Sequence, residues 1–314
     1  MSRSFRYFAL LASLAPLPRA LRAQAAQPAT PPAAPAPASR GTDVYVADLR
    51  RRDGDPSIGR LRRVTNADGY HNQPAFTPDG RAVLFSAAPG GGPGAPPDIY
   101  RYDVREKRVR RLTSTPESEY SPAPLPGGLH FTVLRVERDS AQRLWRLNDE
   151  GLVVTPVLPR ERRVAYYVWS DSARMVLALL DSGGLSLHVA DAGTGALARV
   201  AHPVGRSIQR IPGRAAVSFV QRDSAGTSWL MELDPATRRT RRLLPLPAGA
   251  EHHAWLPDGT LIAGTPQGLL FTRPTVAGDA WHHVRGQPNG PPLAVSRVAV
   301  SPKGDRIAFV AERR

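Results

Sequence analysis

The sequence lacks cysteine altogether over its 314 residues. Disulfides, thiol catalysis, thiolate metal sites and a lipidated N-terminal cysteine are therefore excluded. Lysine is nearly absent too, since Lys107 and Lys303 are the only two, and arginine carries most of the positive charge behind the formal net charge of +15. Such a charge is typical of nucleic-acid or membrane binders, but the arginines are spread over expected strand ends and turns, and no nucleic-acid motif occurs. We therefore expect no nucleic-acid partner.

Long apolar runs are also missing, apart from a short one near the N-terminus. Arg3 and Arg6 precede an apolar run over residues 7–17, and Ala23-Gln24-Ala25 forms the small-x-small pattern that signal peptidase reads. The run is well short of the roughly 20 residues of a membrane-spanning helix, so an uncleaved anchor is the weaker alternative. We predict a signal peptide over 1–25, a Pro/Ala-rich linker over 26–40, and a periplasmic or extracellular protein without a transmembrane segment after cleavage.

Residues 74–86 contain the most informative pattern of the chain. Apolar residues stand on both sides of Pro78-Asp79-Gly80, which supply the fixed φ, the Asx-type hydrogen bond and the left-handed position of a tight turn. The segment is therefore predicted to form strand, turn and strand. Two further strands are predicted over 98–103 and 109–113, separated by a charged turn.

The turn recurs along the chain. Equivalent turn positions fall at 78, 126, 171, 212, 257 and 302, about 41 to 48 residues apart, which is the period of four-stranded propeller blades. Candidate third strands recur over 143–147, 185–191, 228–234 and 268–272. Because the apolar alternation has period two and Gly or Pro interrupts it, a helical fold is excluded. The pattern predicts an all-β protein, a six-bladed β-propeller.

These residues resemble the TolB-like propeller repeat. Its signature is an apolar strand, Ser-Pro-Asp-Gly, a second strand, then Asp-Ile-Tyr and Leu-Thr. Residues 74–86, 98–103 and 112–113 fit it closely, whereas the repeats around Asp171 and Pro212 have lost the Asp-Gly. The resemblance implies a propeller domain over 41–314. We expect no counterpart of the extra N-terminal α/β domain of the TolB protein, because the Pro/Ala-rich linker occupies its place.

The two ends of this domain are predicted to share one blade. Residues 298–300 and 307–311, joined by a turn, supply only first and second strands, while residues 43–48 and 61–65 match third and fourth strands with no strand before them. A blade built from both ends leaves no open sheet edge. We therefore expect five internal blades and one shared blade.

Catalytic motifs are absent. The nucleophile elbow Gly-x-Ser-x-Gly does not occur, because residues 205–207 and 226–228 both lack the closing glycine. Oligogalacturonate lyases resemble this repeat family and bind a metal inside the propeller through His and Gln. By that resemblance the candidate metal ligands are His71, Gln73, Glu119, Glu251, His252 and His253. None of them has a diagnostic spacing. We predict no catalytic residue, metal site or cofactor, and keep a metal-dependent polysaccharide lyase or hydrolase as the alternative function.

The segments that enter the first strands are predicted to meet at one mouth of the central channel. They carry aromatic and polar residues that suit contact with a protein, peptide or glycan, although such residues are also common in hydrated loops. The predicted binding site consists of His71, Asn72, Glu119, Tyr120, Tyr166, Tyr167, Arg206, Glu251, His252 and Arg297. The sequence thus predicts an exported, monomeric binding or scaffold module without catalysis.

Overall fold

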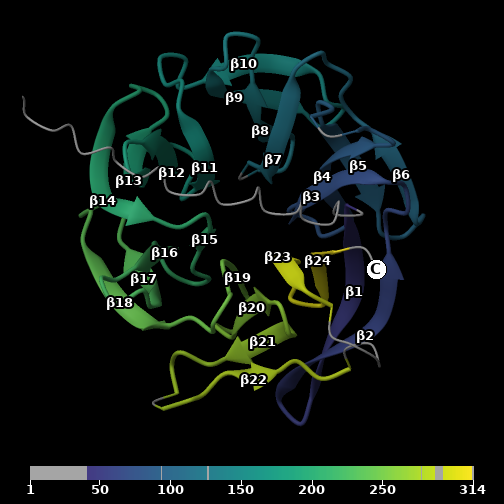
Figure 1. Ribbon diagram of the computed structural model, residues 1–314, viewed down its shortest axis with the longest axis vertical. Helices are drawn as coiled ribbons and strands as arrows, with labels where there is room; N and C mark the ends of the chain where they lie inside the picture. The colour runs from purple at the N-terminus through teal and green to yellow at the C-terminus, as the bar shows by residue number, and fades with distance from the viewer. Residues whose placement is uncertain (1–40, 93, 126, 277, 287–292, 313–314) are drawn as a thin grey trace, which may run out of the picture. The chain divides into compact units, whose positions relative to one another are not determined.

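The computed structural model describes residues 41–92, 94–125, 127–276, 278–286 and 293–312. Over these residues the chain forms 24 strands and no helix, arranged in six antiparallel sheets of four strands each. The sheets stand around a common centre with one strand of each nearest to it (Figure 1). The predicted six-bladed β-propeller is confirmed. The predicted signal peptide (1–25) and linker (26–40) lie outside the described residues.

Five blades are continuous in sequence. Blade 1 contains β3 (Gly69–Phe76), β4 (Ala82–Pro89), β5 (Asp98–Asp103) and β6 (Arg108–Arg111). Blade 2 contains β7 (Ser118–Pro124), β8 (His130–Val136), β9 (Gln142–Asn148) and β10 (Val153–Val157). Blade 3 contains β11 (Val164–Trp169), β12 (Arg174–Asp181), β13 (Gly184–Asp191) and β14 (Leu197–Val204). Blade 4 contains β15 (Ile208–Arg210), β16 (Val217–Arg222), β17 (Ser228–Leu233) and β18 (Thr240–Pro245). Blade 5 contains β19 (His252–Trp255), β20 (Leu261–Thr265), β21 (Gly268–Thr272) and β22 (His282–His283).

Blade 6 closes the ring with strands from both ends of the propeller, as predicted. Its order is β23 (Val295–Val300), β24 (Arg306–Glu312), β1 (Thr42–Arg52) and β2 (Asp55–Arg63), and β1 pairs with β24 from Thr42↔Glu312 to Asp48↔Arg306. The fourth strand begins earlier than the predicted 61–65. Asp53 and Gly54 both have positive φ (54° and 83°) and form a two-residue hairpin turn, a signal that the sequence reading missed.

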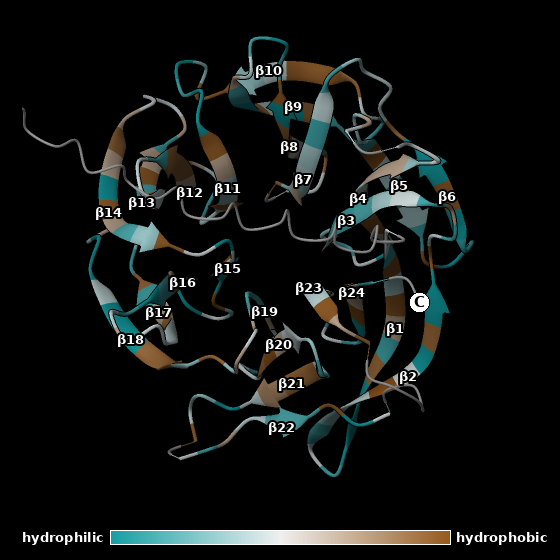
Figure 2. Cartoon of the chain, viewed as in Figure 1, coloured by the Kyte–Doolittle hydropathy of each residue, from teal (hydrophilic) through white to brown (hydrophobic). Residues whose placement is uncertain are grey.

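The core is divided among the contacts between neighbouring blades. Six clusters of buried apolar side chains occur, and each joins one pair of adjacent blades. Phe85 of blade 1, for example, packs in one cluster with Val44 and Val310 of blade 6. The outermost strands are more polar: β6 has no buried residue and is hydrophilic along most of its length (Figure 2). Blade-to-blade burial of this kind supplies the main stabilising term.

The Asp and Thr of the repeat signature hold the third and fourth strands of a blade together. In blade 6 the hydroxyl of Thr65 donates to the carboxylate of Asp43 (2.8 Å), and in blade 1 the hydroxyl of Thr113 lies 3.5 Å from the carboxylate of Asp98. Both carboxylates are buried and each also pairs with an arginine of the fourth strand. A buried carboxylate needs such partners. The most recognisable part of the signature is therefore structural.

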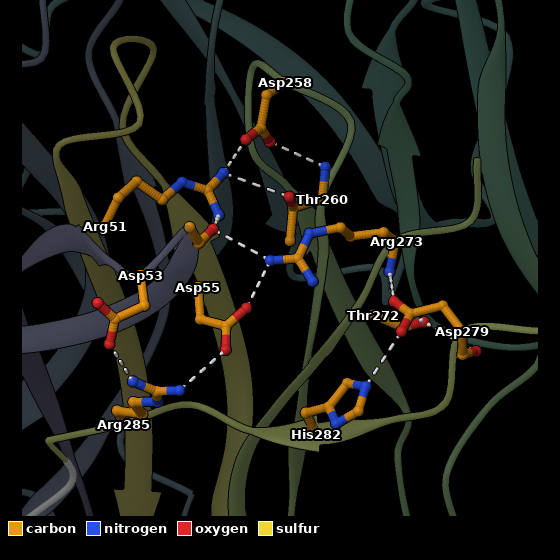
Figure 3. Close-up of polar contacts among 11 residues, drawn as sticks. Arg51, Asp53, Asp55, Asp258, Thr260, Thr272, Arg273, Asp279, His282 and Arg285 are labelled. Carbon is orange, nitrogen blue, oxygen red and sulfur yellow. Dashed lines mark hydrogen bonds and ion pairs between the residues drawn. The ribbon is translucent and has the colours of Figure 1, made fainter. Parts of the chain in front are cut away.

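Blade 5 and the outer half of blade 6 are joined by an ionic network (Figure 3). Asp55 of β2 accepts hydrogen bonds from Arg273 (2.6 Å) and Arg285 (3.3 Å) of blade 5, and Arg51 of β1 pairs with Asp258. The charged groups are partly exposed, so each pair alone contributes little. Together they connect strands that share no loop with blade 5.

Backbone contacts continue this seam. The amide of Ile58 in β2 donates to the carbonyl of Arg285 (2.8 Å). Gly286 follows with φ of +74°, and a Cβ there would lie 2.2 Å from the carbonyl oxygen of Ile58. Only glycine can occupy this position. The close contact between blades 5 and 6 therefore requires glycine after Arg285.

Candidate functional site

A cavity of about 530 Å³ lies at the centre of the ring, and residues from all six innermost strands line it. This volume is within the range of ligand pockets. Each innermost strand runs from a loop at one face to a tight turn at the other, which we call the turn face. The lining begins at Arg206, His252 and Arg297 and ends at exposed Pro78 and Pro302 of the turns, so the cavity opens to solvent at the turn face.

Two bulges shape the cavity wall in blades 1 and 2. Gln73 and Ser121 both have positive φ (57° and 52°), and the pairing with the second strand shifts at both positions. The side-chain oxygen of Gln73 accepts a hydrogen bond from the amide of Ser121 (2.8 Å), and Tyr167 of blade 3 donates to the carbonyl of Ser121 (2.8 Å). These bonds link three consecutive blades at the channel. The innermost strands of blades 1 to 3 are therefore tied to one another at the cavity wall.

Arg297 reaches across the channel. Neighbouring innermost strands follow the order β3, β7, β11, β15, β19, β23 around the ring, so β23 and β11 are opposite each other (Figure 1). The guanidinium of Arg297 on β23 nevertheless lies over the ring of Tyr166 on β11, 5.5 Å from its centroid. Cation–π contacts of this length are attractive. The positive charge of Arg297 is thus held near the axis of the propeller.

Further aromatic and basic side chains surround this contact, and each blade contributes one. We call this set the channel ring; it consists of Tyr70, Tyr120, Tyr166, Arg206, His252 and Arg297. Tyr70 and Tyr120 pack edge to face with centroids 5.9 Å apart. Blades 1 to 3 therefore supply tyrosines and blades 4 to 6 supply basic side chains.

The basic half of the channel ring has no acidic partner. Within the described ranges, neither Arg206 nor Arg297 forms an ion pair. Burial lowers the pKa of Arg297, against the opposing effect of Tyr166 and Tyr70. Burial, followed by the positive charges of Arg297 and Arg206, holds the pKa of His252 well below its ordinary value. His252 is therefore neutral at pH 7, and the two arginines carry the charge.

The structure places the predicted site residues in different surroundings. Those on the cavity wall are Tyr166, Tyr167, Arg206, His252 and Arg297. Asn72 and Tyr120 lie on innermost strands but outside the cavity lining.

The other three predicted residues have structural contacts or lie elsewhere. His71 is buried and its Nδ1 donates to the carbonyl of Thr42 in β1 (2.9 Å). Glu119 is fully buried and accepts from Arg135 (2.6 Å). Glu251 is exposed beside a second cavity of about 270 Å³.

Sequence reasoning missed several residues of the channel. Tyr70 belongs to the channel ring, and Gln73, Ser121 and Gln209 line the cavity. A signal for two of them was present, because Gln73 and Ser121 each precede a proline 48 residues apart. A repeated polar residue before proline within a strand is typical of a bulge.

The residues considered as metal ligands do not converge. No group of three His, Cys, Asp or Glu side chains in the described part of the chain is arranged to hold a metal ion. His253, which is fully buried, lies between the hydroxyls of Ser207 (3.0 Å from Nδ1) and Ser218 (2.7 Å from Nε2). Burial lowers the pKa of His253 to about 3. This histidine is a neutral part of the packing between blades 4 and 5.

Comparisons with known proteins support the fold. No protein-family model matches the sequence, and no curated protein matches it. A protein assigned as TolB from Agrobacterium tumefaciens superposes with a TM-score of 0.65 at 14% identity, over 88% of this chain and all of the other. TolB from Acinetobacter baumannii gives 0.55 at 13% identity, over 86% of this chain and 64% of the other. An oligogalacturonate lyase in complex with manganese gives 0.50 at 12% identity, over 83% of both chains. At these identities the likenesses show the propeller fold, which this chain shares with TolB proteins and with an enzyme.

In the described residues no helix is long and apolar enough to cross a membrane.

Proposed function

We propose that this protein is an exported binding module that holds part of a protein, peptide or glycan partner in its central channel. The observation that carries the proposal is the 530 Å³ cavity, which opens at the turn face and is lined by residues of every blade. The hydrogen bonds that tie blades 1 to 3 together at the wall support binding, because a preorganised surface loses little conformational freedom when a ligand enters. The likeness to TolB structures is compatible with this role but supports it only through the fold.

Photo-crosslinking from inside the cavity tests this function. A benzoyl-phenylalanine residue at position Gln209, on the cavity wall, is expected to capture a discrete partner from the native envelope fraction after illumination. The same residue at Val109, on the outer strand β6, is the control. Equal labelling from both positions, or none from Gln209, would contradict a role of the channel in binding.

The alternative function, a metal-dependent polysaccharide lyase or hydrolase, is tested separately. The donor groups in the described residues do not form a metal-holding set, so we derive no reaction step through a metal. Elemental analysis of the purified native protein checks this point. Manganese, zinc or calcium near one equivalent would favour the enzyme over the binding module.

A further inference from the structure

We infer that the channel ring makes the cavity selective for a carboxylate, presented at the end of a chain that enters from the turn face. The inference rests on the proposed binding function and adds the chemistry of the ligand. It is carried by the position of Arg297, by the charge around it and by the charge along the cavity.

Arg297 keeps hydrogen-bond donors for a further acceptor. Its guanidinium lies 5.5 Å from the centroid of the Tyr166 ring, and a hydrogen bond with Tyr166 raises its pKa against the effect of burial. A guanidinium has five N–H donors, so the contact with Tyr166 leaves most of them for another group. No hydrogen bond from the Arg297 guanidinium to a carboxylate occurs within the described ranges. A planar carboxylate is the acceptor that matches this donor arrangement, because two parallel bonds can form.

The charge around Arg297 favours an anion. Arg206 on the next-but-one blade lowers the pKa of Arg297 and adds a second positive charge to the same side of the channel ring. His252 lies between them in the order of blades and is neutral. Removing a cation from water without a counterion is costly. An anionic group at the channel ring would offset this cost, whereas a cationic group would increase it.

The charge along the cavity favours the same kind of ligand. Between the channel ring and the turn face the described lining residues include no acidic side chain, and the charged residue that this stretch adds is Arg210, again a cation. A cavity lined by one sign of charge attracts groups of the opposite sign. Chain termini and small organic acids both present a carboxylate of this kind.

Calorimetric titration of the full-length mature protein distinguishes these sources. The first probe is the hexapeptide acetyl-Ser-Ala-Ser-Ala-Ser-Ala with a free C-terminus, and the second is the same peptide as its C-terminal amide. Succinate and inorganic phosphate are the small-anion probes. We expect the free acid to bind at least tenfold more tightly than the amide, since a charge-assisted hydrogen bond is lost in the amide.

Variants assign the effect to the channel ring. Arg297→Gln is expected to abolish the preference for the free acid, and Arg297→Lys to retain part of it, because lysine keeps the charge but not the planar donors. If Arg297→Gln does not fold, Arg206→Gln is the second test. Arg206 is exposed, so this variant should keep the fold and weaken the preference for the free acid. Arg108→Gln on the exposed strand β6 makes the same change in net charge and should have no effect.

The outcomes separate this inference from the proposed function. Succinate binding that depends on Arg297, without peptide binding, supports a carboxylate site with a small-molecule ligand. Phosphate binding as tight as that of succinate overturns the selectivity for a carboxylate. Equal affinity for acid and amide, or binding of every probe unchanged in Arg297→Gln, overturns the inference but leaves the channel as a binding site. Absence of all probe binding, together with crosslinking from Gln209, also overturns the inference alone; absence of crosslinking removes the proposed function itself.

Discussion

Removing the two C-terminal strands should prevent the propeller from folding. Deletion of residues 298–314 takes away β24 and half of β23, and leaves β1 without its inner neighbour. Four large apolar side chains that are at most 6% exposed are lost: Val298, Ile307, Phe309 and Val310. At about 1.5 to 3 kcal/mol each, their burial contributes about 6 to 12 kcal/mol. A typical domain has a total stability of about 5 to 15 kcal/mol, so the truncated chain should be unfolded or aggregated.

A matched pair of point variants gives the same test in a measurable range. Val310→Ala, at a fully buried position of β24, should lower the free energy of unfolding by about 2 kcal/mol, because two methyl groups leave the contact between blades 6 and 1. Val109→Ala, at a 37% exposed position of β6, should change it by less than about 0.5 kcal/mol. Urea denaturation followed by tryptophan fluorescence measures both values.

The closure itself can be trapped, because the chain has no native cysteine. Asp48 and Arg306 are direct partners in the β1–β24 ladder, and opposed Cα atoms in a ladder are within the range that a disulfide spans. The double variant Asp48→Cys with Arg306→Cys should form an intramolecular disulfide under mild oxidation, and each single variant should not. A truncated protein that is monomeric and melts within a few degrees of the full chain, or a double variant that never crosslinks while folded, would refute the shared blade.

Three further predictions concern acid stability, processing and the seam. The pKa of His253 is about 3 in the folded state and near 6.5 in the unfolded state, so the unfolded state binds the proton first as pH falls. The free energy of unfolding should therefore decrease by about 1 kcal/mol per pH unit from pH 6 to 4. His253→Gln should reduce this slope, as measured by urea titrations at each pH. Mass spectrometry of the native protein should show cleavage after Ala25, and an uncleaved membrane-embedded product would contradict export. Asp55→Asn should lower the free energy of unfolding by about 1 kcal/mol in low salt and by less in 1 M salt. The control Asp149→Asn, at an exposed aspartate outside the network, should leave it unchanged at both salt concentrations. A decrease for Asp55→Asn that does not depend on salt would show that the network acts through packing.

The architecture was predictable because its signals are local. In the turn at Pro78-Asp79-Gly80 the carboxylate of Asp79 accepts from the hydroxyl of Thr77 (2.6 Å) and from the amide of Arg81 (3.0 Å). These bonds involve neighbours in sequence, so the residue types alone indicate them. Their repetition along the chain then gives the number of blades. The start of β2 was predicted wrongly because its apolar alternation is weak, although the Asp-Gly turn before it is also a local signal.

Five of the ten predicted site residues lie on the cavity wall, but their contacts could not be predicted. Tyr166, His252 and Arg297 each precede a turn position by five residues, which places them at the same level of the innermost strands. Tyr70 precedes the turn position at 78 by eight residues, and the one-residue bulge at Gln73 accounts for only part of this difference, so the count did not indicate it. The contact of Arg297 with Tyr166 depends on the diameter of the ring and on two side-chain conformations, and neither follows from a residue pattern.

Divergence among the repeats gives the channel ring its direction. Six identical repeats would place six identical side chains around one axis, and like charges that close would repel one another and resist ionisation. Here the basic residues are confined to blades 4 to 6, while blades 1 to 3 supply tyrosines, one of which stacks beneath the guanidinium of Arg297. The signature aspartates, by contrast, stay at Asp43 and Asp98, where they hold strands of one blade together. The residues that match the repeat signature therefore hold the blades of the propeller together. The residues that differ between repeats make the channel ring asymmetric and positively charged on one side.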